Sequence, residues 1–336
     1  MRSLPLQFLL LFVLVAAFVV ALGSGSYPLT PAQIAALIGE RFAASTAEPA
    51  SASAAVFWEI RAPRVAAAAI VGSALAAAGL ALQACFRNPL ASPDLLGVSA
   101  GAALGAVLGM FLGWSLAAIH LLAFAGGLVT VGVVYLVARR LALRDRLLSL
   151  LLSGIAIASL LGALIALVKI AADPRGQLPA ITFWLMGSFA GIGPRELVWL
   201  ALGSALGFVP LVLWRWRADA LALSDDEVRS IGIAPAGVRA ALVGGATLAT
   251  AACVAVSGVI GWVGLVVPHA ARLLVGSSFR AALPVSMLLG ATLMVAIDAI
   301  GRTAAAIELP PGVLTALVGA PALFLLIVRV SDERTR

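Results

Sequence analysis

The 336-residue sequence is poor in the side chains that usually carry enzyme chemistry. It has two cysteines, two histidines and one lysine, Lys169. A phosphate-binding P-loop needs a glycine directly before its lysine, and Lys169 has none, so the chain holds no such ATP site. Cys85 and Cys253 stand in separate apolar runs without CxxC spacing, which favours packing roles. Because His120 and His269 lie far apart without acidic neighbours, we expect no metal site and no cofactor.

Charge is also scarce. Only 11% of the residues are charged and 62% are hydrophobic, against about 25% and roughly 45–50% in soluble domains. The mean hydropathy of +1.12 indicates an all-α polytopic membrane protein whose main solvent is lipid. A net charge of +7 also fits nucleic-acid binding, but the basic residues are scattered between apolar runs, which argues against a nucleic-acid partner.

Acidic residues are almost absent from the apolar runs. Asp298 is the one acid near a span, and Arg302, four residues later, is a natural ion-pair partner. A proton relay would need several such acids. Because such acids are missing, a proton-driven or sodium-driven carrier is a less favoured interpretation than a transport subunit that is driven by a partner protein.

The apolar runs predict about ten membrane-spanning helices. The first run is 19 residues long, enough to cross a bilayer, so we expect it to be retained rather than cleaved as a signal peptide. If the N-terminus lies inside, 15 of the 22 basic residues are cytoplasmic and 7 are outside, so the positive-inside rule favours N-in and C-in. The predicted spans are 4–22, 65–86, 95–113, 116–138, 147–170, 197–214, 238–259, 263–275, 282–300 and 312–330.

The most highly charged stretch runs from Arg215 to Gly232 between the sixth and seventh spans. Ser224 followed by Glu227 is a capping box, which predicts a short helix. Gly232 supplies its left-handed stop. So short a helix is marginal alone in water, which indicates that something packs against it. An ordinary polar loop is the alternative; we interpret the stretch as a docking helix for a soluble partner.

Several further stretches carry a resemblance to one family. They are Arg-Ala-Pro-Arg from Arg61, VGSALAAAGLALQ from Val71, RNPLASPDLLGVSAGA from Arg87, WLMGS from Trp184, GWVGLVVPHAARLLVG from Gly261, LPVSMLLGA from Leu283, residues 298–302, and ELPPGVLTALVGAP from Glu308. Together with the capped helix they are collinear over about residues 58–325. The chain resembles the permease subunits of type II ABC importers for iron-siderophore, haem and vitamin B12 (FecCD-like).

The resemblance implies a single transmembrane permease domain over 1–336 that forms a homodimer with the cargo path at the subunit interface. It also implies two cytosolic ABC ATPases that dock on a coupling helix at about 224–231, and a substrate-binding protein outside. ATP hydrolysis would then belong to a separate subunit, and this chain would be no enzyme. The coupling residues are Ser224, Asp225, Asp226, Glu227, Val228, Arg229, Ile231 and Gly232.

In similar importers, arginines at the outer start of span two and the outer end of span nine dock the binding protein. These positions carry Arg61, Arg64 and Arg302 here. Interfacial anchoring or a local ion pair, such as Glu59 with Arg61, is the alternative role. Docking is favoured for Arg61 and Arg64, and less for Arg302 because Asp298 is available to hold it.

The sequence therefore predicts the permease of an importer that moves an iron chelate, a ferric siderophore or haem, across the bacterial inner membrane by alternating access. Vitamin B12 is the alternative cargo. It is slightly less favoured because the segment 140–146 lacks the small hydroxyl residues of the vitamin B12 permease gate. An ATP-independent carrier or channel is the alternative of a different class.

Overall fold

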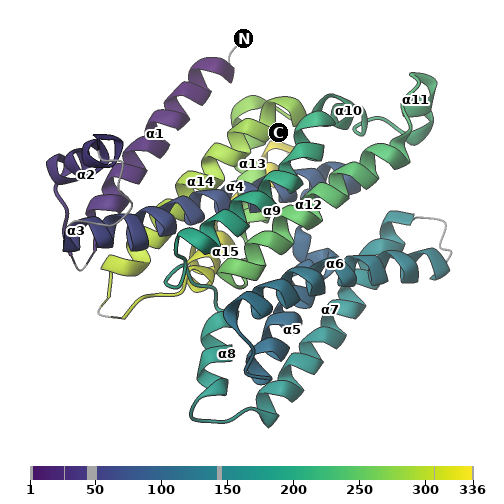
Figure 1. Cartoon of the computed structure of the whole chain (residues 1–336). Coiled ribbons are helices and arrows are strands. Elements are labelled where there is room, and N and C mark those ends of the chain that lie inside the picture. Colours follow the sequence, from purple (N-terminus) through teal and green to yellow (C-terminus); the bar gives the residue numbers. More distant parts are fainter. Residues whose placement is uncertain (1–2, 26, 44–50, 142–145, 306, 335–336) are drawn as a thin grey trace.

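A computed structural model describes residues 3–25, 27–43, 51–141, 146–305 and 307–334, with no strand among them (Figure 1). The helices are α1 (Ser3–Gly23), α2 (Pro31–Ala43), α3 (Ala52–Ala55), η1 (Val56–Arg61), α4 (Ala62–Phe86), η2 (Pro93–Leu96), α5 (Val98–Phe111), α6 (Leu116–Leu141), α7 (Arg146–Ala171), α8 (Gln177–Leu185), α9 (Pro194–Leu213), α10 (Arg215–Ala220), α11 (Asp225–Ser230), α12 (Pro235–Ser257), α13 (Val263–Val275), α14 (Phe279–Thr303) and α15 (Pro311–Arg334).

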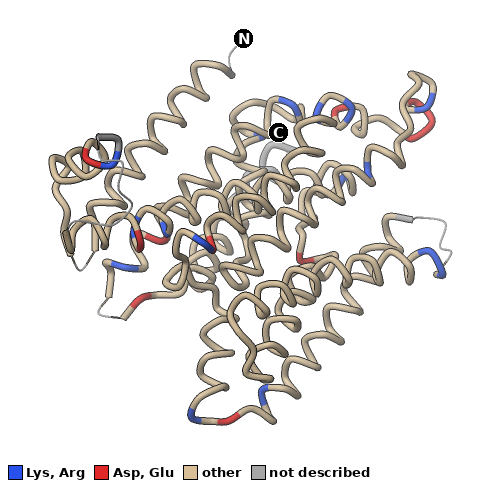
Figure 2. The backbone as a smooth tube through the Cα atoms, viewed as in Figure 1, with Lys and Arg blue, Asp and Glu red and all other residues tan. Residues whose placement is uncertain are grey.

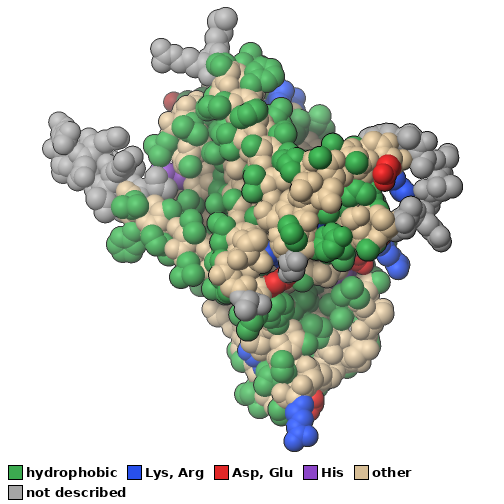
Figure 3. All heavy atoms as spheres, turned by 90° about the vertical axis from the view of Figure 1, so that its left-hand side faces the viewer, with side chains coloured by type: hydrophobic (Ala, Val, Ile, Leu, Met, Phe, Trp, Pro, Cys, Tyr) green, Lys and Arg blue, Asp and Glu red, His purple; other side chains and the backbone are tan. Residues whose placement is uncertain are grey.

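Seven helices in the described part of the chain are long and apolar enough to cross a membrane. The other three predicted spans coincide with shorter apolar helices, Val98–Phe111, Val263–Val275 and Pro311–Leu325. Figure 2 shows that charged residues gather near helix ends and connections, and Figure 3 shows hydrophobic side chains spread over one face of the molecule. Such a surface fits a lipid environment.

The prediction of a continuous third span over 95–113 is wrong at its start. Residues 93–96 form a 3-10 turn, and Gly97 then takes a left-handed conformation at φ 73° before α5 begins. With 14 residues, α5 is about 21 Å long, less than the roughly 30 Å of a bilayer core. The eighth predicted span, in contrast, matches α13 at both ends.

The most deeply buried span is α4, which packs against α9, α12, α13 and α14. Small residues make this possible. A Cβ atom at Gly72 would clash with the backbone of Gly290 in α14, and one at Gly79 would clash with the backbone of Gly264 in α13. The helices therefore meet backbone to backbone, as small residues allow in membranes.

We expect Gly72→Ala to lower the unfolding free energy by about 2 kcal/mol or more, because neither backbone can yield to the added methyl group. Thermal unfolding of the purified protein in detergent measures this. Gly132→Ala in α6 is the control, since within the described residues no atom beyond its chain neighbours and its own helix backbone lies within 4 Å of the added Cβ. Equal melting temperatures for the two variants would contradict the packing described here.

Candidate functional site

The predicted docking helix is present as α11, with its capping box formed in both directions. The Ser224 backbone N–H donates to Glu227 Oε2 at 2.7 Å, and the Glu227 N–H donates to Ser224 Oγ at 3.3 Å. These bonds satisfy donors that a helix start leaves free. Gly232 follows the helix at φ 79°, as its left-handed role requires.

Asp225 anchors α11 to the membrane-spanning helices. Its carboxylate accepts two hydrogen bonds from Arg239 of α12, at 2.8 and 2.6 Å, and one from Arg87 at 3.1 Å. Arg87 follows α4 directly and also donates to the carbonyls of Leu221 and Leu223. The sequence analysis did not single out Arg87 or Arg239, because they lie 138 and 14 residues away from Asp225.

This bonding keeps Asp225 ionised. Hydrogen bonds from Arg239, followed by the charges of Arg239, Arg87 and Arg229, lower the pKa of Asp225 to about 2. A lowered folded-state pKa means that the anchor is at full strength above the ordinary value of 3.8 and is lost only as the pH falls towards 2. Hydrogen bonds from Ser224 likewise lower the pKa of Glu227.

A second acid ties the preceding helix to α14. The Asp219 carboxylate at the end of α10 accepts hydrogen bonds from the Phe279 and Arg280 N–H groups, which are free donors at the start of α14. The Arg280 guanidinium lies 3.9 Å from the centre of the Trp216 ring. The charged stretch is therefore fixed to α4, α12 and α14.

The eight predicted coupling residues divide by exposure. Val228 is completely buried and holds α11 against the protein. The Asp226 side chain is 94% exposed and its partner Arg229 is 60% exposed, and Ile231 is an exposed apolar residue beside them. An acid, a base and an apolar side chain are therefore exposed together on the outer face of α11 and directly after it.

At the opposite end of α4, the three predicted docking arginines lie in one buried cluster. Arg64 Nε donates to Asp298 Oδ1 at 2.8 Å, and Arg302 Nε donates to Asp298 Oδ2 at 3.0 Å. Arg64 also donates to both oxygens of Glu308, at 3.0 and 3.1 Å. The predicted pair of Asp298 with Arg302 is confirmed, and Arg64 shares the same carboxylate.

Arg61 and Arg302 also cap the end of α1. Arg61 donates to the carbonyls of Leu22, at 2.9 Å, and Tyr27, and Arg302 donates to those of Ala21 and Ser24 at 3.0 Å. The last carbonyls of a helix have no partner within it and carry negative partial charge, so arginines stabilise them. The side chains of Arg64 and Arg302 are each 8% exposed. The sequence predicted that these guanidinium groups face a binding protein outside, but in the structure they bond to groups inside the protein.

Gln83 bridges α4 and α13. Pro268 has no N–H for the carbonyl of Gly264 four residues before it. The Gln83 amide donates to that carbonyl at 3.4 Å and to Leu265 O at 3.2 Å, and its oxygen accepts from Arg272. Cys85 and Cys253 are buried, and the part of the chain that the structure describes contains no group of three potential metal ligands.

Comparison with known proteins gives concordant matches. The model of the FecCD transport family matches residues 12–329. The molybdate import system permease of Haemophilus influenzae is 36% identical over 321 residues, covering 96% of this chain and 94% of that protein. A probable iron chelatin transport system permease of Helicobacter pylori is 39% identical over 274 residues, covering 82% of each chain. The structure of a metal-chelate type ABC transporter, described as putative and inward-facing, is similar with a TM-score of 0.86 and 34% identity, covering 97% of this chain and 99% of that one.

We expect Asp298→Asn to lower the unfolding free energy by about 3–5 kcal/mol, because it leaves two buried guanidinium groups without their shared counter-charge. Thermal unfolding measures the loss. Asp173→Asn, the same change at an exposed acid before α8, is the matched control. A similar melting temperature for both variants would mean that the cluster contributes no stability.

Proposed function

We propose, since the chain belongs to the FecCD transport family of ABC importer permeases, that its cargo is an iron chelate, a ferric siderophore or haem. A relative named for iron chelatin supports this choice. The relative named for molybdate and the resemblance to vitamin B12 permeases make these the competing cargoes.

The observation that carries the mechanism is the anchoring of α11. Two cytosolic ATPases dock on its exposed face, formed by Asp226, Arg229 and Ile231. ATP binding and hydrolysis in those subunits move α11, and Asp225 transmits the motion to α4 and α12 through Arg87 and Arg239. The chain itself hydrolyses nothing.

The protein works as a homodimer of ten-helix subunits in the bacterial inner membrane, with N- and C-termini in the cytoplasm and the path between the subunits. The start of α1 and the α11 segment both lie in the upper part of Figure 1, which supports a cytoplasmic N-terminus.

A substrate-binding protein docks outside, on the face that carries Arg61, Arg64 and Arg302. With Asp298 and Glu308, this cluster keeps one net positive charge. The arginines are buried, so docking needs an acidic partner group to replace one of their present acceptors. Glu308, whose side chain is 44% exposed, is the replaceable one.

The test of the proposed function is uptake in proteoliposomes that contain this chain, its ATPase and its binding protein. Ferric siderophore, haem, cobalamin and molybdate are supplied in parallel, with and without ATP. We expect ATP-dependent uptake of an iron chelate alone. Uptake without the ATPase would indicate a carrier or channel, and uptake of cobalamin or molybdate alone would overturn the proposed cargo.

We expect Asp226→Lys to weaken ATPase association about tenfold, because it reverses an exposed charge on the docking face. Affinity of the purified ATPase for detergent-solubilised protein measures this. Asp173→Lys, at an exposed loop acid outside α11, is the control. Unchanged association and uptake for Asp226→Lys would remove the docking role of this face.

We expect Glu308→Gln to strengthen binding-protein affinity about threefold or more at low salt, because it removes the charge of one of the two acids that pair with Arg64 and raises the net charge of the cluster. Binding of the acidic partner is compared at low and high salt. An affinity that is unchanged or weaker at low salt contradicts docking through these arginines.

A further inference from the structure

A cavity of about 640 Å³ lies on the side of the molecule that carries α10 and α11. It is bounded by the end of α4, by α10 and the residues after it, and by the link between α13 and α14. Its volume is enough for about twenty waters, so a phosphate group fits with part of its hydration shell. The polar side chains that matter for its chemistry are Gln83, Arg87, Asn88, Asp219, Arg272 and Ser277.

Arg272 is a cation of this cavity that lacks a counter-charge. It is half-buried, its guanidinium donates to Gln83 Oε1, and it forms no ion pair with an acid in the described part of the chain. Arg87, the other basic residue of the lining, is paired with Asp225, and the acid Asp219 is bonded to the start of α14. Two basic residues and one acid leave the lining with one net positive charge. A partly buried charge without a partner is costly, so the cavity favours an anion.

Asn88 and Ser277 add uncharged donors to the same cavity. The Asn88 side-chain oxygen accepts from the Leu90 N–H at 2.9 Å, which leaves the amide nitrogen without an acceptor among the described residues. Ser277 is exposed in the link between α13 and α14. Arginine binds phosphate through two parallel N–H groups, and amide and hydroxyl donors beside it complete a donor set for phosphate oxygens.

The cavity lies at the level of lipid headgroups. Arg272 is three residues before the end of α13 and Gln83 is three residues before the end of α4, about 4.5 Å along each helix axis. The headgroup region extends roughly 5–7 Å beyond each side of the bilayer core. Leu273 and Leu274, directly after Arg272, are exposed, and so is Trp216 in α10. Exposed leucines with an exposed tryptophan near helix ends are typical of a membrane interface.

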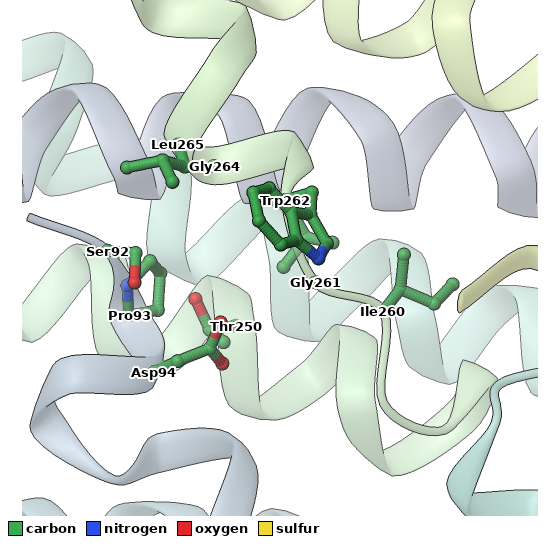
Figure 4. A pocket seen from close by; sticks show the side chains of 10 residues that line it. Ser92, Pro93, Asp94, Thr250, Ile260, Gly261, Trp262, Gly264 and Leu265 are labelled. Atoms are coloured by element: carbon green, nitrogen blue, oxygen red, sulfur yellow. The ribbon is translucent and has the colours of Figure 1, made fainter. Parts of the chain in front are cut away.

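Gln83 joins this cavity to the start of α13. Its amide donates to the carbonyls of Gly264 and Leu265, which Figure 4 shows in the first turn of that helix. There the two residues line a separate cavity of about 150 Å³, whose lining includes the acid Asp94 and no basic residue, so that cavity offers an anion no positive charge. An anion that fixes Arg272 also fixes Gln83, and through it the contact between α4 and α13.

We propose that the cavity of about 640 Å³ binds one phosphate group, carried by an anionic phospholipid of the cytoplasmic leaflet or present as inorganic phosphate. Arg272 pairs with the phosphate oxygens, Asn88 and Ser277 donate to them, and Arg87 adds its charge. Basic pockets between helices at the cytoplasmic surface bind anionic headgroups in other membrane proteins. The choice of leaflet rests on the proposed orientation of the chain, whereas the site itself is independent of the cargo.

The first test is a lipid competition. The purified full-length protein is incubated with equimolar phosphatidylglycerol and phosphatidylcholine of the same acyl chains, and the bound lipids are counted by native mass spectrometry. We expect phosphatidylglycerol to be favoured about tenfold, Arg272→Gln to lower that preference about fivefold, and Arg272→Lys, which keeps the charge, to retain most of it. Arg140→Gln, which removes an exposed charge at the end of α6, is the matched control and should leave the preference unchanged. Equal binding of the two lipids, or the same preference in Arg272→Gln as in the wild type, overturns the lipid site.

The second test separates the two sources of the phosphate. Thermal unfolding of the delipidated protein in neutral detergent is followed with inorganic phosphate and, separately, with phosphatidylglycerol. A rise in melting temperature with the lipid alone assigns the site to a headgroup, and a rise with inorganic phosphate assigns it to the free anion. In both cases we expect Arg272→Gln to remove the rise. No rise with either ligand, or an equal rise in Arg272→Gln, overturns the proposal. It is also overturned if Arg272→Gln weakens ATPase association and leaves both ligands bound, because the cavity then receives an acidic side chain of that partner.

Discussion

The close approach of α4 to α13 and α14 determines where the rest of this structure lies. Glycines on both sides remove the side chains that would hold the backbones apart, at Gly72 against Gly290 and at Gly79 against Gly264. Because the helices touch there, Arg64 reaches Asp298 at one end of α4, and Gln83 reaches the carbonyl that Pro268 leaves free. Because lipid tails are as apolar as the helices, the hydrophobic effect does not drive helices together within a membrane. Close backbone contacts and hydrogen bonds of this kind therefore supply the specificity of packing.

The two ends of α4 are tied to opposite surfaces of the protein. Arg64 joins the cluster that also caps α1, and Arg87 holds the segment before α11. A rigid helix of 25 residues between two ion-paired ends can carry a displacement over about 37 Å. This gives a physical route between the proposed ATPase face and the proposed binding-protein face.

Local patterns in the sequence were sufficient for local structure. The Ser224–Glu227 capping box, the left-handed Gly232 and the Asp298–Arg302 pair are each set by residues three to eight apart, and all are present. Partners far apart in the chain could not be predicted. Arg64 and Asp298 are 234 residues apart, and Gln83 and Arg272 are 189 apart. The start of α5 was also misplaced, because an apolar run does not show where a 3-10 turn interrupts it.

The way in which the two halves of the chain interlock has a consequence for biosynthesis. The first-half helix α4 packs on α13 and α14, whereas the second-half helix α12 packs on α5 and α6. Gly290 is made 218 residues after Gly72, so at about 5–20 residues per second the ribosome needs roughly 10–40 s to supply that partner. During this interval the glycine face of α4 and the Arg64 side chain lie in a membrane without the groups that later cover them. The nascent first half therefore depends on lipid, water or an insertion factor until the second half arrives.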